Sequence, residues 1–272
     1  MHKNPAEHLE ILTCRPASPL PDQPPLLFVH GAYTAAWCWQ EHFLPFFAAA
    51  GFEAHALSLS GHGSSRRRDH LDSYSISDYV NDVAEAVTTL AAPPVLIGHS
   101  MGGFVVQKYL EKHIAPGAVL MCSVPPQGLA ASAFGMLFGR PSLFSELNRL
   151  MTGQMVALDS LREALFYQPV AVDDLARYYR MAQPESHRAI WDMMLFNLPR
   201  AAGVLGHLPR GSADLLIQGA EHDVIIPASL VEMTARSYGV AAIQYPGMGH
   251  GLMLEADWRR PAQAIADWLL SR

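Results

Sequence analysis

The sequence carries little charge and no excess of positive charge. Only 16% of its 272 residues are charged, and the formal net charge is −6 at pH 7. A surface that binds nucleic acid needs clustered Lys and Arg to pair with phosphates, so we expect no nucleic-acid partner. The one basic run, Arg66-Arg67-Arg68, is followed at once by Asp69, which is typical of a solvated loop.

Cysteine is scarce and long apolar runs are missing. The three cysteines (Cys14, Cys38 and Cys122) lack paired spacing, which predicts free thiols rather than disulfides. No stretch approaches the roughly 20 apolar residues of a membrane-spanning helix. Residues 1–5 lack the apolar segment of a signal peptide. We therefore expect a cytoplasmic, soluble protein without a membrane span, and we find no repeats or low-complexity segments.

Apolar strand patterns alternate with helical patterns over most of the chain. Half of the residues are hydrophobic, so the chain can build a large core. Apolar runs separated by amphipathic segments predict an α/β fold with a mostly parallel sheet covered on both faces. The predicted strands are residues 8–13, 26–29, 52–59, 94–97, 118–122, 215–218 and 241–245. The main predicted helices are residues 35–50, 78–87 (opened by Ser77), 104–112, 227–238 and 261–270.

The alternation stops between residues 125 and 206, where the pattern is helical and rich in methionine. A helical insertion between two halves of a sheet is typical of a lid over a ligand site. We expect an α/β core of residues 1–124 and 207–272 with a helical cap of residues 125–206. Methionine and aromatic side chains could line an apolar pocket there, although plain core packing explains them equally well. The pocket candidates are Tyr33, Met136, Phe138, Met155, Trp191 and Met194.

Ser100 lies between two glycines in the run Gly98-His99-Ser100-Met101-Gly102, where an apolar strand pattern changes to a helical one. A serine in a tight strand-to-helix bend exposes its hydroxyl at the edge of the sheet, and flanking glycines let other backbone approach. The pattern Gly-x-Ser-x-Gly arises by chance in about one chain in ten of this composition. The prediction therefore rests on the strand pattern before Ser100 and the helical pattern after it.

An acid and a base follow Ser100 in the order Ser, Asp, His. Asp223 and His250 each come directly after a predicted strand, and parallel strands end at one edge of the sheet. Serine becomes a nucleophile when a neutral imidazole takes its proton, and a carboxylate fixes the tautomer of that imidazole. We therefore predict a catalytic triad, with Glu221 and Asp214 as alternative acids. The glycines around His250 suit a mobile catalytic loop.

A tetrahedral oxyanion needs preorganised backbone donors, and the N–H groups of Ala32 and Met101 are the candidates. His30 and His99 are expected to orient loops rather than to act as bases. No two histidines have metal-ligand spacing on one element, so we expect neither a metal nor an organic cofactor.

Outside residues 125–206, the chain resembles the α/β-hydrolase superfamily over nearly its whole length. The matching landmarks are His30-Gly31, the run Gly61-His62-Gly63-Ser64-Ser65, the bend at Ser100, and the loops of Asp223 and His250. The resemblance implies an α/β-hydrolase fold with a nucleophilic serine, and it does not specify a substrate.

The runs His30-Gly31-Ala32 and Ala36-Trp37-Cys38-Trp39 are similar to a branch that holds plant methyl-ester esterases and hydroxynitrile lyases. In that branch the lyases carry threonine at the position of Gly31 and lysine at that of Gly251. Glycine at both positions resembles the esterases. Serine at position 100 departs from haloalkane dehalogenases and epoxide hydrolases, which use aspartate there, and from dienelactone hydrolases, which use cysteine.

Our main hypothesis is a serine carboxylesterase that cleaves small to medium apolar esters through an acyl-enzyme. Alternatives with the same triad are a lipase or lysophospholipase, a thioesterase, a carbon–carbon bond hydrolase and a cofactor-free perhydrolase. A ligand-binding receptor on a hydrolase fold is the alternative of a different class, since a fold does not fix a function.

Overall fold

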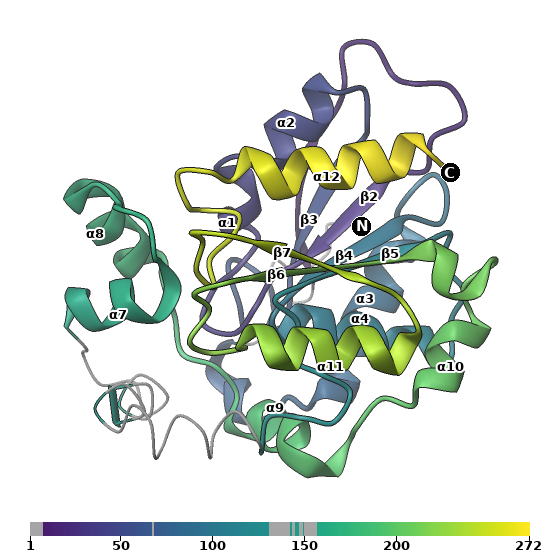
Figure 1. The fold of residues 1–272 in the computed structure, drawn as a ribbon. Coiled ribbons are helices and arrows are strands. Elements are labelled where there is room, and N and C mark those ends of the chain that lie inside the picture. Colours follow the sequence, from purple (N-terminus) through teal and green to yellow (C-terminus); the bar gives the residue numbers. More distant parts are fainter. Residues whose placement is uncertain (1–7, 67, 131–141, 143–144, 147–148, 150–156) are drawn as a thin grey trace.

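Seven strands form one sheet in the order β1-β3-β2-β4-β5-β6-β7 (Figure 1). The computed structural model describes residues 8–66, 68–130, 142, 145–146, 149 and 157–272. β1 pairs antiparallel with β3, and every other neighbouring pair is parallel. The predicted α/β fold is confirmed, and each predicted strand corresponds to one observed. The strands are β1 (Glu10–Cys14), β2 (Leu26–Val29), β3 (Ala54–Ser58), β4 (Val95–His99), β5 (Ala118–Met121), β6 (Leu215–Ala220) and β7 (Ala242–Tyr245).

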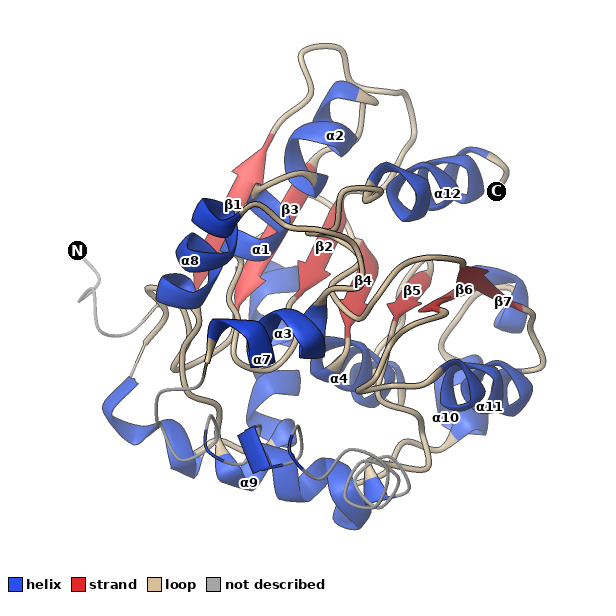
Figure 2. Ribbon diagram, turned by 60° about the vertical axis from the view of Figure 1, so that its left-hand side comes forward, coloured by secondary structure: helices blue, strands red, loops and turns tan. Residues whose placement is uncertain are grey.

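Helices cover both faces of the sheet (Figure 2). Helices α1, α2 and α12 pack on one face, and α3, α4, α10 and α11 pack on the other. α7 and α8 lie to one side of the sheet (Figure 1). The α-helices are α1 (Trp37–Gln40), α2 (Phe43–Ala49), α3 (Ile76–Thr88), α4 (Met101–Leu110), α7 (Leu158–Leu165), α8 (Val172–Met181), α9 (His187–Trp191), α10 (Ala201–Gly206), α11 (Ala228–Tyr238) and α12 (Arg259–Leu270). The described residues also form two short 3-10 helices, η2 (Arg68–Ser73) and η4 (Gly211–Asp214), and one π-helix, η3 (Asp192–Phe196).

The interior strand β2 explains why the sheet is covered on both sides. Leu26 and Phe28 belong to the core on one face, and Leu27 and Val29 belong to the core on the other. All four are fully buried. Because successive strand residues point to opposite faces, an unbroken apolar run requires helices on both faces.

Helix α3 begins two residues earlier than predicted. Ser75, not Ser77, is its N-cap: the Ser75 hydroxyl accepts a hydrogen bond from the N–H of Asp78 (3.2 Å), and the Asp78 carboxylate accepts one from the N–H of Ser75 (2.8 Å). This reciprocal capping box satisfies two N–H groups that the first turn leaves unpaired. The apolar Ile76 then enters the core as the first helical residue.

Residues 35–50, predicted as one helix, form two. α1 ends at Gln40 and α2 begins at Phe43, with His42 in a non-helical conformation between them. Pro45 explains the break, since in a continuous helix its ring would collide with the carbonyl of Glu41. As the third residue of α2, Pro45 needs no hydrogen-bond donor.

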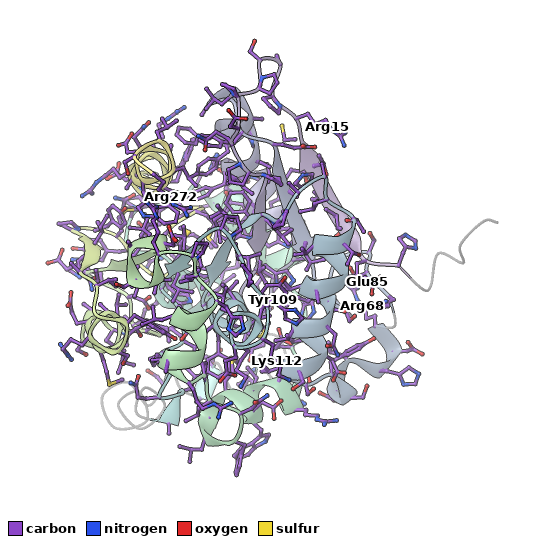
Figure 3. The ribbon with its side chains drawn as sticks, turned by 90° about the vertical axis from the view of Figure 1, so that its right-hand side faces the viewer. Arg15, Arg68, Glu85, Tyr109, Lys112 and Arg272 are labelled. Carbon is purple, nitrogen blue, oxygen red and sulfur yellow. The ribbon has the colours of Figure 1, made fainter. Side chains whose placement is uncertain are left out.

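Within the described residues between 125 and 206 all regular structure is helical, as predicted. The last of these helices, α10, packs against α4, and its Val204 is fully buried in the core. The described ranges contain no helix long and apolar enough to cross a membrane. The three cysteines are free, which confirms that expectation. Charged side chains such as Arg15, Glu85 and Lys112 lie exposed at the surface (Figure 3).

Candidate active site

Ser100 occupies a strained bend between β4 and α4. Its φ is +53° and its ψ is −117°, a backbone conformation that residues other than glycine rarely adopt. The bend is held from both sides: the N–H of Ser100 donates to the carbonyl of Met121 (3.0 Å), and its carbonyl accepts from Val124 (3.2 Å). Neighbouring β5 therefore fixes the conformation that the predicted nucleophile requires.

The glycines on either side of Ser100 are required by close packing. A Cβ on Gly98 would lie 2.5 Å from the carbonyl oxygen of Gly102. A Cβ on Gly102 would collide with the carbonyls of Val29 and His30. Glycine at both positions lets the start of α4 lie directly against β4 and β2, so the bend at Ser100 can form.

Asp223 and His250 are hydrogen-bonded, as the sequence predicts for the acid and the base. The His250 Nδ1–H donates to Asp223 Oδ2 at 2.7 Å, and both side chains are buried. The other carboxylate oxygen accepts from the N–H groups of Ile225 and Ile226 (2.8 Å each). These bonds fix the carboxylate, and they leave Nε2 of His250 as the basic nitrogen.

The two alternative acids lie elsewhere. Asp214 is paired with Arg210 and Arg272, each at 2.7 Å. Glu221 is exposed and accepts from the backbone N–H of Gly247. Asp223 is therefore the acid that contacts His250.

His99 connects the bend at Ser100 to the loop that carries His250. Its Nε2–H donates to the carbonyl of His250 (2.9 Å), and the ring centroids of the two histidines are 4.7 Å apart. Burial, reinforced by the nearby His250, holds the pKa of His99 well below its ordinary value. The neutral His99 ring thus holds the loop of His250 near Ser100, the residue that follows His99 in the sequence.

The loop after β2, which carries Ala32, passes beside Ser100. A Cβ on Gly31 would lie 3.1 Å from the Cβ of Ser100, so the backbone of the residue before Ala32 borders the serine. In the part of the chain that the structure describes, the N–H of Ala32 donates to no protein acceptor. The N–H of Met101 opens α4, where a helix leaves its donors unpaired.

His30 fixes this loop. Its Nδ1–H donates to the carbonyl of Gly31 (2.8 Å), and its Nε2 accepts from the N–H of Leu59 (3.0 Å). Burial, together with the nearby His62, lowers the pKa of His30 to about 3, so the ring is neutral. A histidine with both nitrogens engaged in this way orients the loop.

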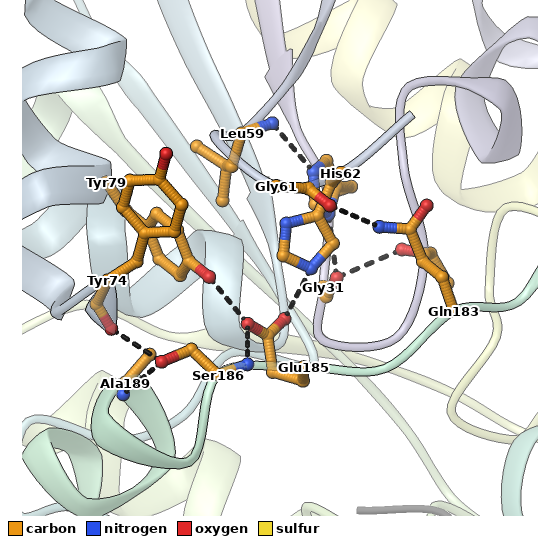
Figure 4. A network of polar contacts seen from close by, with 12 residues as sticks. Gly31, Leu59, Gly61, His62, Tyr74, Tyr79, Gln183, Glu185, Ser186 and Ala189 are labelled. Carbon is orange, nitrogen blue, oxygen red and sulfur yellow. Dashed lines mark hydrogen bonds and ion pairs between the residues drawn. The ribbon is translucent and has the colours of Figure 1, made fainter. Parts of the chain in front are cut away.

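His62 and Glu185 form a buried ion pair that the sequence did not predict (Figure 4). The His62 ring lies next to His30, with ring centroids 5.0 Å apart. His62 Nε2 and Glu185 Oε2 are 3.0 Å apart, and both side chains are fully buried. The other oxygen of Glu185 accepts from the Tyr79 hydroxyl and the Ser186 N–H (2.7 Å each). Burial disfavours the imidazolium, but the charge of Glu185 and the hydrogen bonds of His62 to Glu185 and to the Ser60 carbonyl together outweigh it and raise the pKa of His62. His62 stands in a recognised motif, whereas nothing near Glu185 in the sequence marks it as a partner.

The predicted pocket residues are only partly described. Tyr33 adjoins Ala32, is partly buried, and its carbonyl accepts from the N–H of Gln183 (3.0 Å). Met194 is partly buried, whereas Trp191 is 62% exposed at the end of α9. Met136, Phe138 and Met155 lie outside the described residues.

Cys122 places a thiol next to the Asp223–His250 pair. Ligating atoms of these three residues lie within 4.8 Å of one another, a spacing that could hold a metal ion. Burial and the neighbouring Asp223 raise the pKa of the Cys122 thiol well above its ordinary value, so it stays protonated. Nδ1 of His250 also donates to Asp223, so two of these three side chains are bound to each other.

Comparison with known proteins identifies relatives of this chain. A family model described as the alpha/beta hydrolase family matches residues 26–268. Protein phosphatase methylesterase 1 of Bos taurus is 29% identical over 158 residues, covering 53% of this chain and 42% of that protein. Methyl jasmonate esterase 1 of Vitis vinifera is 37% identical over 89 residues, covering 32% of this chain and 33% of that protein. The chain thus spans less than half the length of these curated relatives.

Solved structures share the fold. The monoacylglycerol lipase of Paleococcus ferrophilus superimposes with a TM-score of 0.68 at 18% identity, covering 97% of this chain and 99% of that chain. An esterase of Exiguobacterium antarcticum superimposes with a TM-score of 0.69 at 15% identity, covering 96% and 95%. At such identities the likeness concerns the fold alone.

Proposed function

Since the chain belongs to the alpha/beta hydrolase family, we propose that it is a carboxylic ester hydrolase in which Ser100, His250 and Asp223 act as a catalytic triad. The observation that carries this proposal is the buried 2.7 Å bond between His250 and Asp223, on a loop that His99 ties to the bend at Ser100. A carboxylate on Nδ1 leaves Nε2 free to accept the serine proton.

In the proposed reaction, Ser100 Oγ attacks the ester carbonyl carbon while His250 Nε2 takes the hydroxyl proton. The carbonyl electron pair moves to oxygen, and the N–H groups of Ala32 and Met101 stabilise the oxyanion. One such donor lowers the barrier by about 3–4 kcal/mol. Collapse of this intermediate re-forms the carbonyl and expels the alcohol, which takes the proton from His250.

Water completes the cycle. His250 removes a proton from water, and the resulting hydroxide attacks the acyl carbon on Ser100. The second tetrahedral intermediate releases the carboxylic acid, and the proton returns from His250 to Ser100 Oγ. Asp223 stabilises the imidazolium in both halves and fixes its orientation. No step requires a metal or an organic cofactor.

The proposed substrate is an ester with a small or medium apolar acyl group. The names of the curated relatives, a methylesterase and a methyl jasmonate esterase, support a small alcohol on the ester. The proposed cap, residues 125–206, would enclose the acyl group, with Tyr33 beside the oxyanion donors.

A serine-directed fluorophosphonate tests the mechanism. We expect the phosphorus to bond to Ser100 Oγ with loss of fluoride, so the intact mass of the wild-type protein increases by one adduct. The Ser100→Ala variant should remain unlabelled, whereas Ser64→Ala, which removes an exposed serine hydroxyl, should label like the wild type. A folded wild-type protein that forms no adduct on Ser100 would refute the proposed mechanism.

A further inference from the structure

Glu255 is a buried carboxylate in the turn between the His250 loop and α12. Its Oε1 accepts two backbone hydrogen bonds, from the N–H of Gly249 (2.8 Å) and from that of Tyr167 (2.6 Å). Burial raises the pKa of Glu255, and these two donors oppose the shift by stabilising the carboxylate. Gly249 precedes His250, and Tyr167 follows α7 in the stretch of residues 125–206. One carboxylate oxygen therefore joins the histidine loop to that stretch.

The glycines flanking His250 allow the same close contact. A Cβ on Gly249 would lie 2.8 Å from the nitrogen of Tyr167, and one on Gly251 would lie 3.1 Å from the carbonyl oxygen of Leu165. Neither glycine has a left-handed φ, so space and not backbone freedom requires glycine here. The N–H of Gly251 donates to the Leu165 carbonyl (2.7 Å). Close packing and a hydrogen bond thus hold both glycines against residues 165–167.

Further contacts continue this junction on both sides. Gln168 donates to the Asp257 carboxylate (2.8 Å) and accepts from the Asp257 N–H (2.9 Å). The Tyr167 ring stacks on His222, the neighbour of Asp223, with centroids 3.6 Å apart. Residues 165–168 thus contact His222, which precedes the proposed acid, and Gly249 and Gly251, which flank the proposed base.

We propose that Glu255 is a positioning residue for His250, which makes the placement of the histidine depend on the seating of residues 165–168. This inference rests on the proposed function, in which Nε2 of His250 is the base. A base must lie within about 2.6–3.2 Å of the proton that it takes. A displacement of about 1 Å can lower a catalytic rate by about 100-fold. Glu255 fixes Gly249, the residue before His250, and so determines where the imidazole lies.

Glu221 provides a matched control. It also accepts a backbone N–H from the loop of His250, that of Gly247 at 3.0 Å. Its side chain is 55% exposed, however, whereas Glu255 is buried against Tyr167. If a carboxylate bound to this loop supported activity only through general stability, Glu255→Ala and Glu221→Ala would lower kcat to the same extent.

The test compares Glu255→Ala, Glu255→Gln and Glu221→Ala with the wild type in hydrolysis of p-nitrophenyl butyrate, together with the melting temperature and fluorophosphonate labelling of each protein. We expect Glu255→Ala to lower kcat by about 10- to 100-fold with KM changed by less than about 3-fold, because the displaced histidine affects chemistry more than binding. Glu255→Gln keeps an acceptor oxygen and should restore most of kcat. Glu221→Ala should match the wild type.

A folded Glu255→Ala protein with wild-type kcat, or a loss of melting temperature without loss of kcat, would overturn the inference. If Glu255→Ala does not fold, Gly251→Ala tests the same contact, because the added Cβ would lie 3.1 Å from the Leu165 carbonyl oxygen and would displace residues 165–168. Gly206→Ala is its control, since a Cβ at Gly206 has no neighbour within 4 Å. Wild-type kcat in Gly251→Ala would likewise overturn it. A wild-type protein that fails to label at Ser100 would instead refute the proposed function.

Discussion

Three buried histidines around the proposed site differ in charge because their partners differ. His30 accepts a backbone N–H at one nitrogen, and His99 lies beside another histidine, so burial keeps both neutral. His62 faces Glu185, and this carboxylate raises its pKa despite equal burial. The same residue type therefore orients a loop in two places and forms an ion pair in the third.

The His62–Glu185 pair predicts a pH dependence of stability. A histidine with a raised folded pKa contributes stability that is fully present below its unfolded pKa of about 6.5 and is lost as pH rises through the folded pKa. The free energy of unfolding, measured in urea from pH 6 to 9, should therefore fall more steeply for the wild type than for Glu185→Gln. The lowered pKa of His30, about 3, has the opposite sign, but its effect is confined to pH below about 6.5 and so lies almost wholly outside this range. A gap between the two proteins that does not change with pH would contradict this account.

The proposed triad could be predicted residue by residue, whereas Glu185 and Glu255 could not. Ser100, Asp223 and His250 each follow an apolar strand, and local sequence marks such positions. Glu255 bonds the N–H of Tyr167, a residue 88 positions away, and a carboxylate that accepts a distant backbone N–H leaves no local pattern.

At the scale of elements, apolar periodicity located the strands and most helices but not every boundary. Ile76 is the first residue of α3 and is buried in the core, and its N-cap is the preceding residue, Ser75. Ser77 lies on the exposed side of the first turn. Pattern alone could not separate the two serines, because both precede an apolar helical repeat.

Replacement of Ser75 by alanine tests this boundary. Ser75→Ala should lower the free energy of unfolding by about 1 kcal/mol, since it removes a side-chain acceptor from the first turn of α3. Ser77→Ala, which alters an exposed side chain two residues later, should change stability by less than about 0.5 kcal/mol. Urea denaturation of both variants checks the difference, and equal effects would show that Ser75 is not the energetically important cap.

At the scale of the whole molecule, the stretch of residues 125–206 contacts both loops of the proposed site. Residues 165–168 bind the loop of His250, and Gln183 binds the carbonyl of Tyr33 beside the oxyanion donors. If the proposed cap lies across the serine, these two points of contact hold it there and limit the length of the acyl chain that fits.

Hydrolysis of p-nitrophenyl esters from acetate to palmitate tests this enclosure. We expect kcat/KM to peak at short to medium acyl chains, because the proposed cap would leave no room for a long one. The Ser100→Ala variant gives the background rate to subtract. A maximum at palmitate would contradict the enclosed site and favour a lipase, for which Trp191, Leu195 and Phe196, each more than 60% exposed, would offer an apolar surface.

The sequence by itself determined the α/β fold, the order of its strands along the chain, and the residues at the strand ends, because apolar periodicity and glycine-flanked bends are local properties of the chain. Only the tertiary structure decided that His62 pairs with Glu185, and how Glu255 and residues 165–168 hold the loop of His250. Those outcomes depend on contacts between residues distant in sequence, whose distances and burial exist only once the sheet and its helices are packed.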